Sequence, residues 1–112
     1  MVCDLTPPKG EDTGPTALEL AIMALADCAA TIFLDVAKQS KIETGKLEVV
    51  ADADKSADSP KLKGVKMNVY VSSKARKQLL EAVWRRTEVN CPVVSIFTDP
   101  VPVKIDLKIE SE

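Results

Sequence analysis

Cysteine is the residue type with the most distinctive chemistry in this 112-residue chain, which contains Cys3, Cys28 and Cys91. The chain contains no histidine, which excludes Cys-His nucleophiles, Ser-His hydrolysis and histidine metal sites. An odd number of widely spaced cysteines argues against a zinc ribbon and against a secreted disulfide framework. We therefore expect no metal and no resident cofactor. Each cysteine is either a small buried side chain or a redox-active thiol.

The surroundings of Cys28 and Cys91 leave both interpretations open. Cys28 lies in the middle of the apolar stretch ALADCAATIF, whose alanines suit either close packing or the approach of a reacting partner. Cys91 begins the stretch CPVVSIF, and the proline after it is typical of the first position of a helical turn. Unpaired N–H groups and the helix dipole stabilise a thiolate there, although an ordinary core cysteine fits the pattern equally well. Cys3 has no assigned role.

The composition indicates one soluble globular domain over residues 1–112, in which 1–14 form a short N-terminal segment. Hydrophobic residues make up 46% of the chain and charged residues 29%. A net charge of −2 and an aromatic content of 4% argue against nucleic acid as a partner. The N-terminus lacks the apolar core of a signal peptide, and the apolar stretch 20–34, interrupted by Asp27, is too short for a membrane span. We expect a cytoplasmic protein without a membrane partner.

The most strongly patterned element is a predicted helix from Ala17 to about Lys38. Thr16 and Glu19 predict a capping box at its start. Apolar residues occupy nearly every side, so the helix belongs at the centre of a fold or at a subunit interface. Its most regular apolar stripe comprises Leu18, Ile22, Leu25, Ala29, Ile32 and Val36.

Alternating apolar residues predict strands at 46–54, 65–71 and 101–110, with a polar loop between the first two and at most a further short strand near 2–5. A second helix is expected over 73–89, with Ser73 as its cap. Its buried residues are predicted to be Leu79, Leu80, Val83 and Trp84. One-sided strands and segregated helices predict an α+β fold, with an antiparallel sheet packed on the long helix.

Four segments together resemble the OsmC/Ohr family of osmotically induced and organic hydroperoxide resistance proteins: GPTALELAIMALADC, KLKGVKMNVYV, NCPVVSIF and VPVKIDLKIE. Family members place a first cysteine inside a long central helix and a second in a Cys-Pro context after the second long helix. The resemblance covers about residues 12–110. It implies an OsmC-like fold and an intertwined homodimer with both central helices in the shared core. Most of the family's N-terminal sheet has no counterpart in residues 1–14.

By this resemblance Cys28 is the peroxidatic cysteine and Cys91 the resolving cysteine of an organic hydroperoxide reductase that defends against oxidative stress. Oxidation of Cys28 to a sulfenic acid, condensation with Cys91 and reduction by an external dithiol of lipoyl type make up the implied cycle. An apolar pocket lined by Leu25, Ile32 and Phe97 would favour organic peroxides.

The chain departs from the family pattern at two charged positions. The family's arginine from the N-terminal sheet is missing, and Arg85 and Arg86 are either its substitutes or solvated charges. Glu19, the candidate for the family's catalytic glutamate, is alternatively only the capping partner of Thr16. Two other hypotheses therefore stay open: a non-catalytic OsmC-like dimer that binds a small apolar ligand or senses oxidation, and a purely structural domain.

Overall fold

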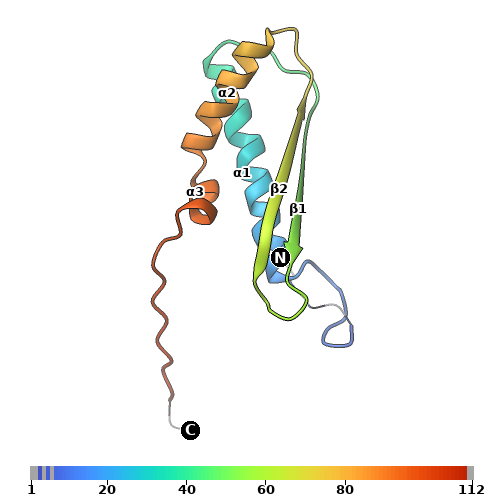
Figure 1. The fold of residues 1–112 in the computed structure, drawn as a ribbon, viewed down its shortest axis with the longest axis vertical. Coiled ribbons are helices and arrows are strands. Elements are labelled where there is room, and N and C mark those ends of the chain that lie inside the picture. The colour runs from blue at the N-terminus through green and yellow to red at the C-terminus, as the bar shows by residue number, and fades with distance from the viewer. Residues whose placement is uncertain (1–2, 4, 6, 111–112) are drawn as a thin grey trace.

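The computed structural model describes residues 3, 5 and 7–110, and these form an α+β architecture of helices beside an antiparallel pair of strands (Figure 1). The predicted α+β class is confirmed. The strand expected near 2–5 lies largely outside the described residues. In chain order the elements are α1 (Ala17–Gln39), β1 (Leu47–Lys55), β2 (Leu62–Val71), α2 (Lys77–Asn90) and α3 (Pro92–Thr98).

Helix α1 begins and ends with hydrogen-bonded caps. The predicted capping box is present: Glu19 N–H donates to Thr16 Oγ1 at 3.1 Å, and Thr16 N–H donates to Glu19 Oε1 at 2.9 Å. At the other end, Lys41 N–H donates to the carbonyl of Lys38, and Ile42 N–H to that of Ala37. This is a Schellman motif, with Lys41 at the left-handed position that usually holds glycine (φ 57°).

The two strands form a hairpin, with Leu47 opposite Val71 and Ala51 opposite Met67. As predicted, alternate residues of each strand turn toward the helices, and their neighbours face solvent. Ala53, expected on the inner face, is exposed; it lies toward the loop that connects the two strands. The hairpin therefore offers one apolar face to α1, the helix that it contacts most extensively.

Helix α2 begins later than predicted. Arg76 is its N-cap residue and contributes no side-chain cap. Ser73, the expected cap, instead donates from its hydroxyl to the carbonyl of Glu43 at 2.7 Å and accepts from Ala75 N–H. Ser73 thus ties the end of the sheet to the segment after α1. The expected burial of Leu79 is also wrong, because this side chain is 49% exposed on the outer side of the helix.

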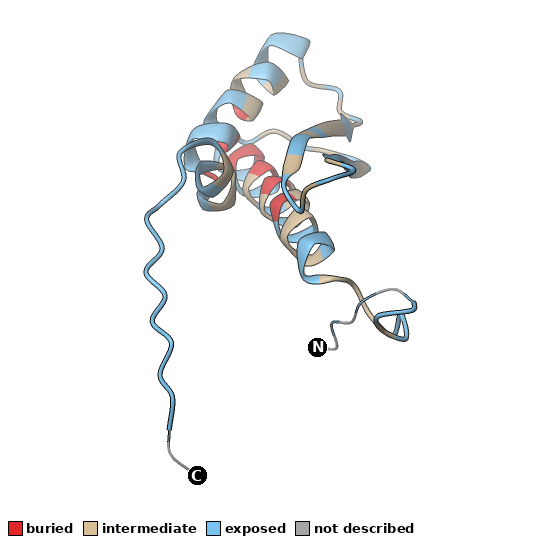
Figure 2. Ribbon diagram, turned by 60° about the horizontal axis from the view of Figure 1, so that its bottom comes forward, coloured by how far each residue is buried: buried red, intermediate tan, exposed pale blue. Residues whose placement is uncertain are grey.

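The core lies where α1 crosses α2. Its fully buried cluster consists of Phe33, Val36, Ala37 and Val83, and the rings of Phe33 and Trp84 lie 6.3 Å apart between centroids. The buried stripe of α1 (Figure 2) is centred further round the helix than predicted, since Phe33 and Ala37 are buried whereas Ile32 is only partly buried and Leu18 is exposed. Among the described residues, α1 is long and apolar enough to cross a membrane, a criterion that core helices of soluble proteins also meet.

Residues 101–110 are extended but form no strand in this structure, which corrects the sequence prediction. They leave α3 and run away from the rest of the chain (Figure 1). A strand is defined by hydrogen bonds to a neighbour, and within one copy this segment has no neighbouring strand. The alternation of apolar and polar residues predicted the extended conformation correctly. A strand also requires a hydrogen-bonded neighbouring strand, which the pattern cannot predict.

A single copy exposes far more surface than a compact protein of its size. The exposed area is 9043 Å² and the radius of gyration 18.0 Å. Compact monomers of 12.1 kDa expose about 6,000 Å² and have a radius of gyration of about 13 Å. The large excess indicates surface that is suited to burial against another molecule.

Replacement of Lys41 by glycine tests the Schellman motif. Because a left-handed conformation is strained for lysine but not for glycine, Lys41→Gly should raise the free energy of unfolding by roughly 0.5–1 kcal/mol. The matched control Lys38→Gly, inside the last turn of α1, should lower it by a similar amount. Urea unfolding followed by circular dichroism measures both. Destabilisation by Lys41→Gly would show that the lysine side chain, rather than the backbone, stabilises this helix end.

Candidate functional site

The structure brings Cys28 and Cys91 together. Cys28 lies in the middle of α1, and Cys91 is the single residue between α2 and α3, with Pro92 at the first position of α3 as predicted. The Cys91 thiol points at the other sulfur as a hydrogen-bond donor, with the two Sγ atoms 2.8 Å apart. A disulfide bond requires about 2.05 Å, so the sulfurs need to approach by less than about 1 Å.

The packing of α1 on α2 sets this distance. Along α2, Val83, Thr87 and Cys91 are at most 2% exposed and recur every four residues, so they form one buried stripe. The Thr87 hydroxyl donates to the carbonyl of Val83 at 2.8 Å, which satisfies its polar group inside the core. The stripe thus carries Cys91 to the same helix interface that holds the core cluster.

Burial distinguishes the two thiols. Cys91 is 1% exposed, whereas Cys28 is only half-buried. Burial, and then the hydrogen bond to Cys28, raise the pKa of the Cys91 thiol above its ordinary value, although the backbone N–H groups of Val94 and Val93 act in the opposite direction. The expectation that the start of α3 favours a Cys91 thiolate is therefore wrong, because desolvation outweighs the N–H groups. The surroundings therefore favour the protonated form of Cys91, and Cys28 is the thiol that solvent can reach.

Glu19 lies at the beginning of α1, where its carboxylate is bonded to Thr16. The backbone N–H and then the hydroxyl of Thr16 lower the pKa of Glu19. Cys28 lies nine positions along the helix from Glu19, a rise of about 14 Å that the glutamate side chain cannot span. Within one copy Glu19 is therefore a capping residue, and the structure does not bring it to the cysteines.

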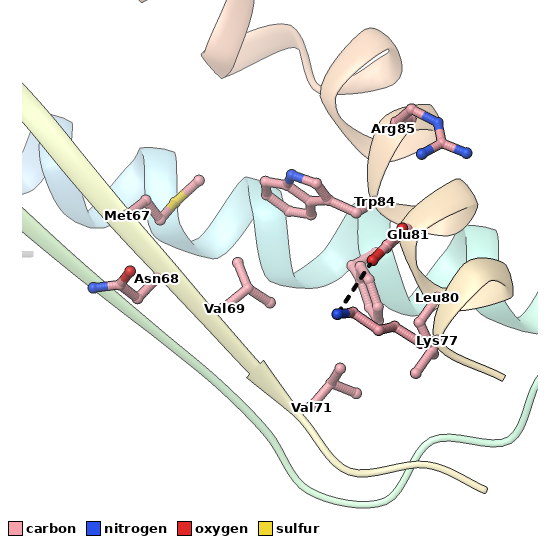
Figure 3. Close-up of a pocket in the computed structure, with 10 residues that line it drawn as sticks. Met67, Asn68, Val69, Val71, Lys77, Leu80, Glu81, Trp84 and Arg85 are labelled. Carbon is pink, nitrogen blue, oxygen red and sulfur yellow. Dashed lines mark ion pairs between the residues drawn. The ribbon is translucent and has the colours of Figure 1, made fainter. Parts of the chain in front are cut away.

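The two arginines considered as substitutes have other surroundings. The Arg86 guanidinium donates to Ser40 Oγ at 3.2 Å. Arg85 lies at the edge of a groove between β2 and α2 (Figure 3). In the described part of the chain, no hydrogen bond joins an arginine to Cys28 or Cys91. Both arginines are exposed, as the alternative of solvated charges predicts.

The groove in Figure 3 has a volume of about 570 Å³ and differs from the pocket expected at Leu25, Ile32 and Phe97. None of those three residues lines it. The groove was not predicted from the sequence, because its walls come from segments that are distant in sequence. The chain's one tryptophan, Trp84, which lines the groove, is the residue that could have indicated it. Its lining includes Phe33, Met67, Asn68, Val69, Val71, Lys77, Leu80, Glu81, Trp84 and Arg85.

Comparisons with known proteins agree with the described fold. A family model for OsmC-like proteins matches residues 10–106. An OsmC-like protein from Mycoplasma pneumoniae aligns with a TM-score of 0.72 and 15% identity, over 78% of this chain and 64% of its own. An OsmC-like hydroperoxide resistance protein from Jannaschia sp. aligns with a TM-score of 0.73 and 18% identity, over 97% of this chain and 83% of its own.

A third solved structure, an OsmC-like protein of unknown function from Vibrio cholerae, aligns with a TM-score of 0.59 and 20% identity, over 81% of this chain and 64% of its own. The chain therefore spans less than two thirds of the length of two of these structures. The comparison with curated proteins gave no match. At these identities the structural likeness establishes the fold.

The raised pKa of Cys91 predicts a pH-dependent stability under reducing conditions. Because the folded state favours the neutral thiol, its contribution to stability is complete below the ordinary pKa of 9.0 and is lost as the pH rises through the higher folded value. The free energy of unfolding of the wild type should therefore fall above pH 9 relative to that of Cys91→Ser, whose hydroxyl does not titrate there. Urea unfolding across this range measures both, and parallel curves would contradict the assignment.

Proposed function

The chain belongs to the OsmC-like family, and on that premise we propose that it reduces organic hydroperoxides through Cys28 and Cys91. The observation that carries the proposal is the 2.8 Å distance between the two sulfurs. Two cysteines without a shared role have no reason to be adjacent when they are 63 residues apart in the sequence. The printed name of the Jannaschia relative, a hydroperoxide resistance protein, agrees with this activity.

Exposure assigns the first chemical step to Cys28. A peroxide that enters from solvent meets the half-buried Cys28 before the 1% exposed Cys91. The Cys28 thiolate attacks the terminal oxygen of R–O–OH, so an S–O bond forms and the O–O bond breaks. The sulfur is oxidised to a sulfenic acid, and the alkoxide takes a proton and leaves as an alcohol. The Cys91 thiol stabilises the attacking thiolate through the hydrogen bond that it donates.

The second step joins the two sulfurs. The Cys91 sulfur attacks the Cys28 sulfenic acid, an S–S bond replaces the S–O bond, and water leaves with the thiol proton. An external dithiol, of lipoyl type in the family's manner, then reduces the disulfide by exchange and is itself oxidised to a disulfide. This cycle needs a supply of reduced thiols, which agrees with the cytoplasmic location inferred from the sequence.

We place this chemistry in a homodimer. The exposed area exceeds that of a compact monomer by roughly 3,000 Å², whereas a standard interface buries about 800 Å² of each partner. Exposed apolar side chains on α1, including Met23 and Leu34, contribute to this excess. Sedimentation equilibrium should give twice the chain mass of 12.1 kDa. A mass of 12.1 kDa at micromolar concentration would contradict the dimer.

The peroxidase proposal is tested by consumption of cumene hydroperoxide and of hydrogen peroxide, with a dithiol as reductant. Wild type should consume the organic peroxide in many turnovers, whereas Cys28→Ser should fall to the rate of the buffer alone. Cys91→Ser should complete one oxidation and stop at a sulfenic acid, which a dimedone adduct detects by mass. The matched control Cys3→Ser should retain wild-type turnover.

The alternative is an OsmC-like dimer that senses oxidation without catalysis. It is favoured by the lack of a hydrogen bond between an arginine and the cysteine pair in the described residues, since a cation would promote the thiolate. The same assay separates the two functions. Formation of the disulfide once per chain, at the rate of an ordinary thiol, would exclude the peroxidase and support the sensor.

A further inference from the structure

The cysteine pair can do more than form a disulfide. Cys28 and Cys91 are both free thiols, and their Sγ atoms lie 2.8 Å apart. A soft ion that bonds to both sulfurs closes a ring through the two cysteines, and such a chelate is much tighter than a bond to one thiol. The ion that fits depends on the angle between its two sulfur bonds and on the number of further ligands that it requires.

The distance between the sulfurs favours a small bond angle. Bonds from sulfur to a soft ion such as Zn²⁺ are about 2.3 Å long, and those to arsenic(III) are of similar length. At this length a tetrahedral ion holds two sulfurs about 3.8 Å apart and a linear ion about 4.6 Å apart, whereas a right angle holds them about 3.3 Å apart. The observed sulfurs need to separate by only about 0.5 Å to reach the right angle.

The pair also offers only two protein ligands. In the part of the chain that the structure describes, no cluster of three or more histidine, cysteine or carboxylate side chains could hold a metal ion. A structural zinc site requires four such ligands. Arsenic(III) takes three ligands with bond angles near a right angle, and an organic arsenical already carries one of them as its carbon substituent. Two thiols therefore complete its coordination without any other residue.

The surroundings leave room for the substituent and for the small separation. Cys28 is half-buried, and on its helix face Ala24 and Thr31 are exposed on one side while Ile32 is partly buried on the other. An organic group on arsenic thus has solvent on one side and an apolar side chain on the other. Cys91 lies between two helices in extended backbone, and α3, which follows it, has no buried side chain, so a small shift there disturbs little packing.

We propose that the reduced Cys28–Cys91 pair captures trivalent arsenicals that carry one organic substituent. With R–As(OH)₂, two As–S bonds form and two As–O bonds break, and each hydroxide takes a thiol proton and leaves as water. Arsenic stays trivalent and neither sulfur is oxidised, so no oxidant or reductant is consumed. The inference rests on the position of the two thiols and not on peroxide reduction, although capture would occupy the cysteine proposed to react with peroxide.

The first test measures uptake of phenylarsine oxide by the full-length chain, reduced and then freed of reductant, with native mass spectrometry and a count of remaining thiols. Wild type should take up one phenylarsenic group and keep one of its three thiols, that of Cys3. Cys28→Ser and Cys91→Ser should bind at least about 100-fold more weakly, because one thiol forms no chelate. The matched control Cys3→Ser should bind as wild type does. Equal binding by Cys91→Ser, or loss of the Cys3 thiol in wild type, would overturn the proposal.

The second test uses wild type alone and so does not depend on the folding of a variant. A small 1,2-dithiol should release the arsenical, whereas the same concentration of thiol groups supplied as a monothiol should leave it bound. Excess Zn²⁺ should not slow the capture. Release by the monothiol, or protection of the pair by Zn²⁺, contradicts a two-thiol site shaped for arsenic. Peroxide turnover is measured separately: capture without turnover contradicts only the proposed function, and turnover without capture contradicts only this inference.

Discussion

The packing of α1 against α2 is the constraint on which the rest of the structure depends. One register of the two helices places the Phe33 ring against Trp84 and the Cys28 sulfur against Cys91. Packed interiors are nearly as dense as molecular crystals, so a helix shift that strained the ring contact would also move the sulfurs apart. The same apolar contacts that stabilise the fold therefore set the distance over which the two thiols can react.

The environment makes two chemically identical side chains different. Cys91 lies between α2 and α3 and is buried in the same stripe as Thr87, whereas Cys28 is only half-buried. Desolvation keeps the first as a thiol and leaves the second open to solvent. This difference between the two thiols needs no charged partner. Among the described residues no arginine is hydrogen-bonded to either cysteine, and burial alone distinguishes them.

Local signals in the sequence predicted the local features well. The Thr16 capping box, the inner faces of the hairpin and Pro92 at the start of α3 each depend on residues a few positions apart. The Cys28–Cys91 adjacency, by contrast, was implied only by family resemblance. The cap at Ser73 and the sign of the pKa shift at Cys91 were wrong, because tertiary contacts outweighed the local preference in both cases.

The burial of Cys91 also bears on how an oxidised molecule returns to its starting state. In the proposed cycle a reductant would reach the half-buried Cys28 sulfur of the disulfide rather than the buried Cys91, so Cys91 would be the leaving group of the exchange. Thiols with a raised pKa depart slowly, since the negative charge that develops on sulfur is poorly stabilised in an apolar surrounding. Under the proposed function, recycling rather than oxidation would then limit the steady-state rate, and the disulfide form would accumulate while peroxide is present.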